Sequence, residues 1–171
     1  MNAPVQTMEQ LMAQALAMER EAVARYGELA EMMEVHNNRE VAELFRKMAG
    51  YEAHHVEQIL HDMGWSADSA PVVHEGAWVT PEAPEAVPID EMHYLMHPWH
   101  ALQLARAAEQ RAVAFFDALA RQAAGEDIRR AAEEMRAEEV EHVALIDSWL
   151  AKVEPPAADW ADDPDPPRYE D

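Results

Sequence analysis

The sequence predicts an all-α fold, an antiparallel four-helix bundle of two repeated helical hairpins joined by a long crossover. The 171 residues include only 5 glycines, and the abundant alanine, glutamate, leucine and methionine favour helix over strand. Apolar residues recur every three or four positions in four segments, at about residues 8–34, 39–63, 98–124 and 127–152. The first two segments match the last two, which indicates an internal repeat. We place the bundle domain at residues 1–153, a length that one hydrophobic core can stabilise.

The first two segments form the first hairpin. Only a few residues separate residues 8–34 from residues 39–63. Asn37 or Asn38 can cap the start of the second helix, and Gly64 can end it in the left-handed conformation. A connection this short makes the two helices antiparallel neighbours.

A long crossover, about residues 64–97, follows the first hairpin. It contains SADSAPVVHEGAWVTPEAPEAVP, which is rich in proline and small residues and is too long for a hairpin turn. We therefore expect it to run from one end of the bundle to the other. The sequence IDEMHYLMHPW allows a short additional helix before the third segment. Pro98 suits the first turn of that segment, where the missing N–H of proline costs little.

The second hairpin and a tail complete the chain. Gly125 separates residues 98–124 from residues 127–152, so this connection is also short. The last residues, 154–171, form an acidic, proline-rich tail that cannot bury enough apolar surface to fold by itself. Two interpretations stay open: the tail is disordered, or its Trp160 and Tyr169 dock on the bundle or on a partner.

The repeat is clearest between the second and fourth segments, because its matches include polar residues. The aligned pairs are Met48/Met135, Glu52/Glu139, His55/His142, Val56/Val143 and Ile59/Ile146. The first and third segments align in the same way, with Glu19 opposite Glu109. A repeated helix pair has one apolar face that needs a partner, so we expect the two hairpins to meet around a pseudo-twofold axis.

Six polar residues fall on the apolar stripes that the helical period turns toward the bundle interior. They are Glu19 in the first segment, Glu52 and His55 in the second, Glu109 in the third, and Glu139 and His142 in the fourth. An unpaired carboxylate in an apolar interior loses several kcal/mol of hydration free energy, and these four also repel one another. None of the stripes carries a Lys or Arg. Bound metal cations are therefore the best explanation.

The residue types also indicate which metal. Glu and His three residues apart project from one helical face, so the second and fourth segments each offer a carboxylate and an imidazole. The first and third segments each add a carboxylate that can bridge two ions or cap one. Two divalent ions balance four carboxylates when both imidazoles are neutral. Oxygen and imidazole ligands without sulfur suit two Fe ions, our first choice, with Mn or a mixed Fe/Mn pair as alternatives.

These motifs resemble a known family. The sequences EREAVARY with EAHH, and EQRAVAFF with EVEH, resemble the paired Glu and Glu-x-x-His pattern of the ferritin-like di-iron carboxylate superfamily, most of all its rubrerythrin branch. The resemblance covers the four predicted helices. It implies that the same six residues bind the two Fe ions and serve as the catalytic centre of an oxidoreductase that reacts Fe(II) with O2 or H2O2. Ferroxidase, peroxide reduction in oxidative stress, and a non-catalytic iron-carrier or storage-associated role all fit this pattern.

The chain departs from typical rubrerythrins at two points. It has no cysteine, so it resembles erythrin-type members that lack the cysteine-bound rubredoxin-like centre, and a separate electron-donor protein becomes a possible partner. Typical members also tend to have a further Glu three residues after the ligand of the third helix. That position is Ala112 here, which matches Ala22 in the first helix. The resemblance is therefore to the simpler, symmetric members.

A few further residues are candidates for roles near the site. Tyr26 lies on the stripe of Glu19, where it can hydrogen-bond a ligand carboxylate, donate an electron or fill the core as its counterpart Phe116 does. Tyr51 is one position off the stripe, which predicts a place at a helix interface. His54 points about 100° away from His55, which predicts a place on the surface or beside the ligands.

A histidine cluster before the third helix is a weaker candidate. His93, His97 and His100 lie close to Trp99 in the sequence and could form a secondary metal site. Histidines this close together near the end of a bundle are more often incidental. We therefore do not include them in the predicted centre.

Charge and composition exclude several functions. The net charge of −21 repels nucleic acid and anionic lipid and attracts cations, although most of the carboxylates serve solubility. The absence of cysteine excludes disulfides and thiolate metal sites. The opening MNAPVQTMEQ lacks a signal-peptide pattern, and no apolar run approaches the roughly 18 residues of a membrane span. We expect a cytoplasmic protein without a membrane partner, as a monomer or a homodimer.

Overall fold

The structure is a computed structural model that describes residues 7–73 and 97–156. Its helices are α1 (Met8–Val35), α2 (Arg39–Met63), α3 (Pro98–Arg121) and α4 (Glu126–Leu150). No strand occurs among these described residues. The predicted all-α class is confirmed, and so are the four helices, although α3 ends earlier than the predicted residue 124 because Gln122 takes its C-cap position.

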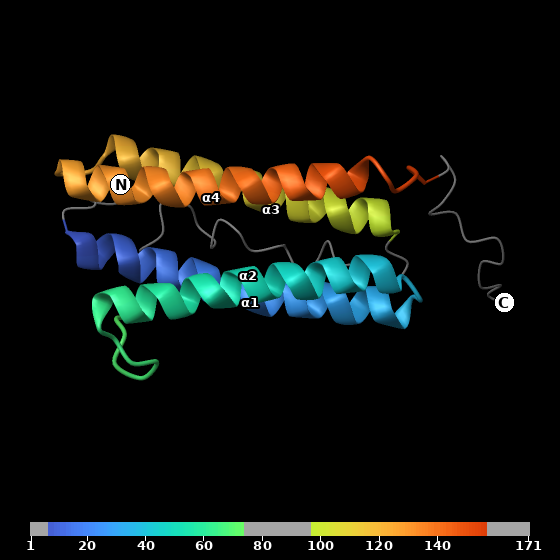
Figure 1. Cartoon of the computed structure of the whole chain (residues 1–171), viewed down its shortest axis with the longest axis horizontal. Coiled ribbons are helices and arrows are strands. Elements are labelled where there is room, and N and C mark those ends of the chain that lie inside the picture. The colour runs from blue at the N-terminus through green and yellow to red at the C-terminus, as the bar shows by residue number, and fades with distance from the viewer. Residues whose placement is uncertain (1–6, 74–96, 157–171) are drawn as a thin grey trace, which may run out of the picture.

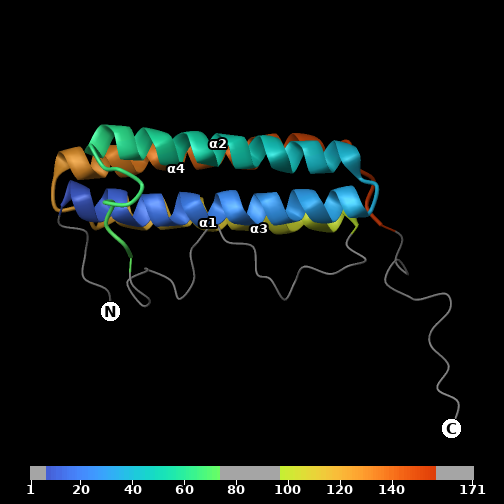
Figure 2. The same cartoon turned by 90° about the horizontal axis from the view of Figure 1, so that it is seen from below.

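The four helices form two antiparallel hairpins that pack against each other. Figure 1 shows α1 and α2 as one pair and α3 and α4 as the other. Figure 2, turned by 90°, shows α2 level with α4 and α1 level with α3. Figure 1 also shows that α2 ends and α3 begins at opposite ends of the bundle, as the predicted crossover requires. Outside the described residues lie the short helix predicted before Pro98, His93, and most of the tail with Trp160 and Tyr169.

The helix ends are capped as their sequences favour, with one exception. Thr7 caps α1 through a capping box, in which its hydroxyl accepts a 3.1 Å hydrogen bond from the backbone N–H of Gln10. Gly64 ends α2 with a φ of 66°, as predicted. The predicted side-chain cap of α2 is wrong. Asn38 makes no capping hydrogen bond, and Asn37 instead takes a left-handed φ of 59° in the turn, which asparagine tolerates.

The start of α3 shows what one of the clustered histidines does. His97 is the N-cap residue, and its Nδ1 accepts a hydrogen bond from the backbone N–H of Trp99 at 3.1 Å. Pro98 occupies the first turn, as the sequence predicts. The side chain of His97 therefore satisfies a backbone donor at a helix end.

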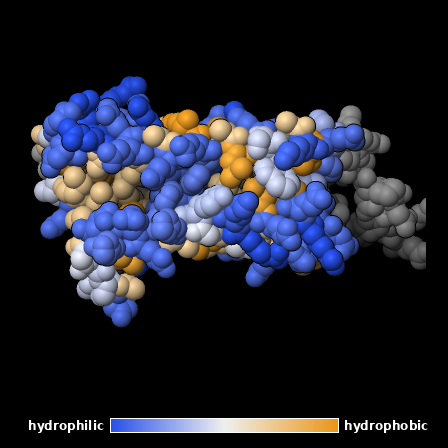
Figure 3. Space-filling model, in the orientation of Figure 1, coloured by the Kyte–Doolittle hydropathy of each residue, from blue (hydrophilic) through white to orange (hydrophobic). Residues whose placement is uncertain are grey.

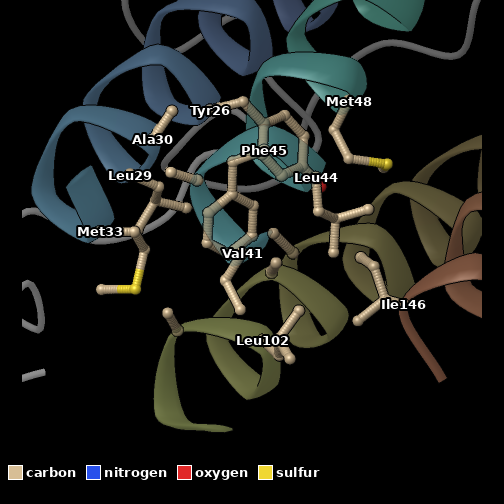
Figure 4. Packing of buried hydrophobic residues seen from close by; sticks show 14 of the residues in the cluster. Tyr26, Leu29, Ala30, Met33, Val41, Leu44, Phe45, Met48, Leu102 and Ile146 are labelled. Atoms are coloured by element: carbon tan, nitrogen blue, oxygen red, sulfur yellow. The ribbon is translucent and has the colours of Figure 1, made fainter. Parts of the chain in front are cut away.

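The hydrophobic core consists of two clusters, one toward each end of the bundle. The first includes Tyr26, Phe45, Met48, Leu102 and Ile146, and Figure 4 shows them drawn from both hairpins. The second includes Leu11, Leu16, Ile59, Phe116 and Leu119. In every helix the six polar positions singled out above separate members of one cluster from members of the other. The site therefore lies at mid-length, with apolar packing on both sides.

The surface is mostly hydrophilic on the face that α2 and α4 form, and a few hydrophobic side chains gather near its middle (Figure 3). None of the four described helices is both long and apolar enough for a membrane crossing.

Candidate metal centre

The structure brings all six predicted ligand residues together. The side chains of Glu19, Glu52, Glu109 and Glu139 are at most 3% exposed, which is unusual for carboxylates. His142 is 8% exposed, and His55 is only partly buried. Each helix contributes one or two of these residues, and they lie on the stripe that the helical period predicted.

One group of ligand atoms gathers around His55. Glu19, Glu52, His55 and Glu139 each offer one ligand atom, and these atoms all lie within 4.8 Å of one another. Nδ1 of His55 lies 3.4 Å from a carboxylate oxygen of Glu19 and 3.2 Å from one of Glu52. A single cation between them would contact oxygen atoms from three helices and one imidazole nitrogen.

A second group gathers around His142. It consists of Glu52, Glu109, Glu139 and His142, again with ligand atoms within 4.8 Å of one another. Nδ1 of His142 lies 2.9 Å from Glu52, 3.3 Å from Glu139 and 3.5 Å from Glu109. Glu52 and Glu139 thus belong to both groups, which suits carboxylates that bridge two ions. Glu19 and Glu109 belong to one group each, which suits terminal ligands.

The two imidazoles hold each other in place across the gap between the hairpins. The rings of His55 and His142 are stacked, with centroids 5.5 Å apart and planes 12° apart. Tyr51 also stacks on the His142 ring, with centroids 6.1 Å apart, and is itself 41% exposed. Both Nδ1 atoms therefore point in a fixed direction, toward the carboxylates.

Most buried polar atoms of the site lack a hydrogen-bond partner. The contacts between Nδ1 and carboxylate oxygens have ion-pair distances but not hydrogen-bond geometry. The atoms without a hydrogen-bond partner include Oε2 of Glu19 and Glu109, both carboxylate oxygens of Glu52 and Glu139, and Nδ1 of His55 and His142. Within the described part of the chain, no Lys or Arg forms an ion pair with the four carboxylates. Buried donor atoms of this kind fit metal ions, because metal coordination satisfies lone pairs that have no proton donor.

The pKa values of the buried carboxylates and imidazoles also indicate that the site needs positive charge. Burial raises the pKa of Glu19 and that of Glu139 well above the ordinary value. Contacts with Glu19 and Glu52 raise the pKa of His55 to about 10. Burial opposes the charged form of His142, but its carboxylate neighbours outweigh burial and raise its pKa. These shifts all favour bound protons, which carry the same positive charge that metal cations would supply.

The pKa of Glu52 moves in the opposite direction to those of Glu19 and Glu139. Burial alone would raise the pKa of Glu52, but its contacts with His142 and His55 outweigh burial and lower that pKa below its ordinary value. Of the two carboxylates that both groups share, Glu52 thus keeps its negative charge more readily than Glu139.

Tyr26 links the two hairpins at this site. From α1, its hydroxyl donates a hydrogen bond to Oε1 of Glu109 on α3, and its ring stacks on Phe45 with centroids 6.0 Å apart. Of the roles that the sequence left open, the structure thus shows both the hydrogen bond and core packing. The counterpart Phe116 has no hydroxyl, so only one of the two terminal carboxylates receives this bond.

Residues next to the ligands contact the site in ways that the sequence did not predict. Oε2 of the exposed Glu138 lies 3.4 Å from Nε2 of His55. Glu138 and Tyr51 occupy equivalent positions in the repeat, each one residue before a ligand Glu, and helical periodicity turns such a position away from the core. The repeat was the signal that could have found Glu138. His54 is exposed on the surface, as predicted.

The histidine cluster before α3 does not take part. The two groups described above are the only ones of at least three ligand-type side chains at metal-binding distances in residues 7–73 and 97–156. His97 caps α3, and His100 packs edge-on against Trp99, with ring centroids 5.1 Å apart.

Comparison with known proteins agrees with the geometry. The sequence model of the family described as Rubrerythrin matches residues 10–87. The crystal structure of an uncharacterised conserved protein from Magnetospirillum magnetotacticum MS-1 is 35% identical in sequence, and the match covers 88% of this chain and 98% of that one with a TM-score of 0.72. No curated protein matches the chain significantly. The chain therefore belongs to the rubrerythrin family of ferritin-like di-iron proteins.

Proposed function

We propose that this protein is a non-haem di-iron oxidoreductase that holds two iron ions, one in each of the two ligand groups, and reacts Fe(II) with O2 or H2O2. The observation that supports this most is the pair of buried carboxylates, Glu52 and Glu139, that belong to both groups and have no hydrogen-bond partner. A site for a single ion would not need two shared carboxylates. Two adjacent iron ions would supply electrons and polarise the O–O bond of the oxidant.

The donor set favours iron. Carboxylate and imidazole ligands without sulfur suit iron or manganese, and four carboxylates balance the charge of two divalent ions. Each imidazole must be neutral to coordinate, so it gives up its proton on loading.

The residues of the chain would have distinct tasks. Glu52 and Glu139 set the separation of the two positions, and the stacked His55 and His142 fix one nitrogen ligand at each. Glu19 and Glu109 would each hold one of the two ions and supply negative charge to it. The two core clusters on either side of the site exclude water along the bundle axis.

The test is an anaerobic Fe(II) titration followed by mixing with O2 or, separately, with H2O2. We expect two Fe(II) per chain and, with at least one oxidant, a rise in near-ultraviolet absorbance that is faster than oxidation of free Fe(II). The variant His142→Ala should lose one of the two ions, whereas His61→Ala, which changes an exposed histidine on α2, should keep both.

Two results would contradict the proposal. Two-metal binding that survives His142→Ala would show that the ions bind elsewhere. Binding of two ions without accelerated oxidation by either oxidant would favour a carrier of iron over an oxidoreductase.

A further inference from the structure

Two openings on the face of α2 and α4 reach the metal centre. The first, which we call the acidic opening, has a volume of about 310 Å³ and is lined by Glu19, Asp62, Glu134 and Glu138 among others. The second, which we call the aromatic opening, has a volume of about 410 Å³, and its walls include Tyr51, Glu141, His142 and Leu145. His54, His55 and Glu138 line both openings. Figure 3 views this face of the molecule.

Apart from His54 and His55, the titratable residues that line the acidic opening are all acidic. Asp62 on α2 lines the opening together with Glu134 and Glu138 on α4, and all three residues are exposed. None of the described residues that line it is a Lys or Arg. A concave surface with charge of one sign concentrates counter-ions and speeds their association.

The inner end of the acidic opening is a ligand of the metal centre. The side chain of Glu19 is 3% exposed, lines the opening, and has an Oε2 atom without a hydrogen-bond partner. Glu138 stands beside it, 3.4 Å from the outer nitrogen of His55. Carboxylates thus lie along the opening from the exposed rim to the buried centre.

The size of the acidic opening suits a hydrated cation. A divalent ion with roughly six waters occupies about 200 Å³, at about 30 Å³ per water. The volume of the opening is therefore large enough to hold the ion together with its waters. Carboxylate oxygens along the wall can then replace those waters one at a time.

The aromatic opening is less suited to cations. Of its two carboxylates, Glu138 is shared with the acidic opening, so only Glu141 is its own. Tyr51 and Leu145 contribute apolar surface, and the inner end is the stacked ring of His142. None of the described residues that line it is an unpartnered buried carboxylate.

We propose that the acidic opening is the uptake route for the divalent cations of the centre, with Asp62 and Glu134 forming a transient outer binding site. This inference rests on the proposed two-metal function. Asp62 and Glu134 are positioning residues that act on how fast the cation arrives, so they should affect the rate of loading and leave the final occupancy unchanged.

The test compares two double variants that remove the same charge from the same two helices. Asp62→Asn/Glu134→Gln alters the acidic opening alone, and Glu138 is left intact because it lines both openings. The matched control is Glu57→Gln/Glu141→Gln, in which Glu57 is exposed on α2 and lines neither opening. Loading with Co(II), which does not need oxidant, is followed by stopped-flow absorbance at low and high salt, and circular dichroism verifies the fold of each variant.

We expect Co(II) association to be about 3- to 10-fold slower for Asp62→Asn/Glu134→Gln at low salt, with the difference shrinking at high salt. The control should load at nearly the wild-type rate, and all three proteins should end at two Co(II) per chain. Equal rates in all three, or equal slowing in both variants, would overturn the uptake route and leave the two-metal function standing. Fewer ions in Asp62→Asn/Glu134→Gln would make these residues ligands, which also overturns it. Failure of the wild type to bind Co(II) would instead contradict the two-metal function itself.

Discussion

At the scale of single residues, Glu52 is the clearest example of a carboxylate that belongs to both ligand groups. One of its oxygens lies 2.9 Å from Nδ1 of His142, and the other lies 3.2 Å from Nδ1 of His55. One carboxylate thus faces both ligand groups, and its side chain is completely buried. A neutral amide of the same shape could not balance two cations.

The variant Glu52→Gln tests this role through stability. Anaerobic Fe(II) at about 1,000 times its Kd should raise the Tm of the wild type by roughly 10 °C, because bound ligand stabilises the folded state by about 4 kcal/mol. In Glu52→Gln most of that rise should disappear. Differential scanning calorimetry with and without metal measures it, and Glu43→Gln, at an exposed position of α2, serves as the control. A full metal-dependent rise in Glu52→Gln would contradict the shared role.

The hydroxyl of Tyr26 supports Glu109 and has no equivalent at Glu19, because the counterpart is Phe116. We expect Tyr26→Phe to retain two metal ions but to bind one of them with about 10-fold lower affinity. Residues that hydrogen-bond metal ligands have effects of that size on metal affinity. Anaerobic isothermal titration calorimetry should separate the two affinities. Tyr51→Phe keeps the stacking on His142 and should leave both affinities unchanged. If Tyr26→Phe and the wild type bind both metal ions with equal affinity, the hydrogen bond does not support the site and Tyr26 only fills the core.

Metal binding should depend steeply on pH. The pKa of His55 is raised to about 10 and that of His142 is also raised, so at pH 7 both imidazoles hold a proton in the absence of metal. Loading must displace these protons, so we expect at least two protons released per chain and an overall binding constant that rises about 100-fold per pH unit near neutrality. Titration in a weak buffer with a pH-indicator dye measures the release. Metal binding without proton release would mean that the imidazoles are not ligands.

At the scale of helices, the residues that could be predicted are those with a periodic signal. Glu19 and Glu109 lie in apolar stripes, and the repeated Glu-x-x-His motif placed two more carboxylates and both histidines on the same faces. The structure brings these six together because the two hairpins meet as the repeat indicated.

Other features of the helices have no such signal. Which carboxylates belong to both groups depends on the distance between the hairpins, so the sequence could not single out Glu52 and Glu139. Glu138 and Tyr51 lie outside the stripe. They contact His55 and His142, respectively, only because their side chains are long enough to extend past the edge of the helix. Asn38 matched the preference for an N-cap residue but makes no capping bond, because a preference does not fix the side-chain rotamer.

His97 allows a test at the N-terminus of α3. Its Nδ1 caps the helix, so His97→Ala should lower the free energy of unfolding by about 1 kcal/mol, and His97→Asn should recover much of it because Asn is a strong N-cap residue. Urea unfolding followed by circular dichroism measures both. Metal stoichiometry should stay at two in either variant. Loss of a metal ion in His97→Ala would instead revive the secondary metal site.

At the scale of the whole molecule, the site joins the two hairpins. Each ligand group contains residues from both α2 and α4, so each metal ion would connect the hairpins at mid-length, between the two core clusters. The near-symmetry of the repeat explains why the two groups are alike. Tyr26 and the acidic opening make the two groups different. Tyr26 contacts Glu109 of the group around His142, whereas the acidic opening is lined by Glu19 of the group around His55.

The most direct test of the two-metal centre is anomalous diffraction at the iron edge from crystals loaded anaerobically with Fe(II). The account predicts two peaks per chain about 3.5 to 4 Å apart, the separation typical of two-metal sites. One should lie among Glu19, Glu52, His55 and Glu139, and the other among Glu52, Glu109, Glu139 and His142. A single peak, or peaks only at other residues, would contradict it.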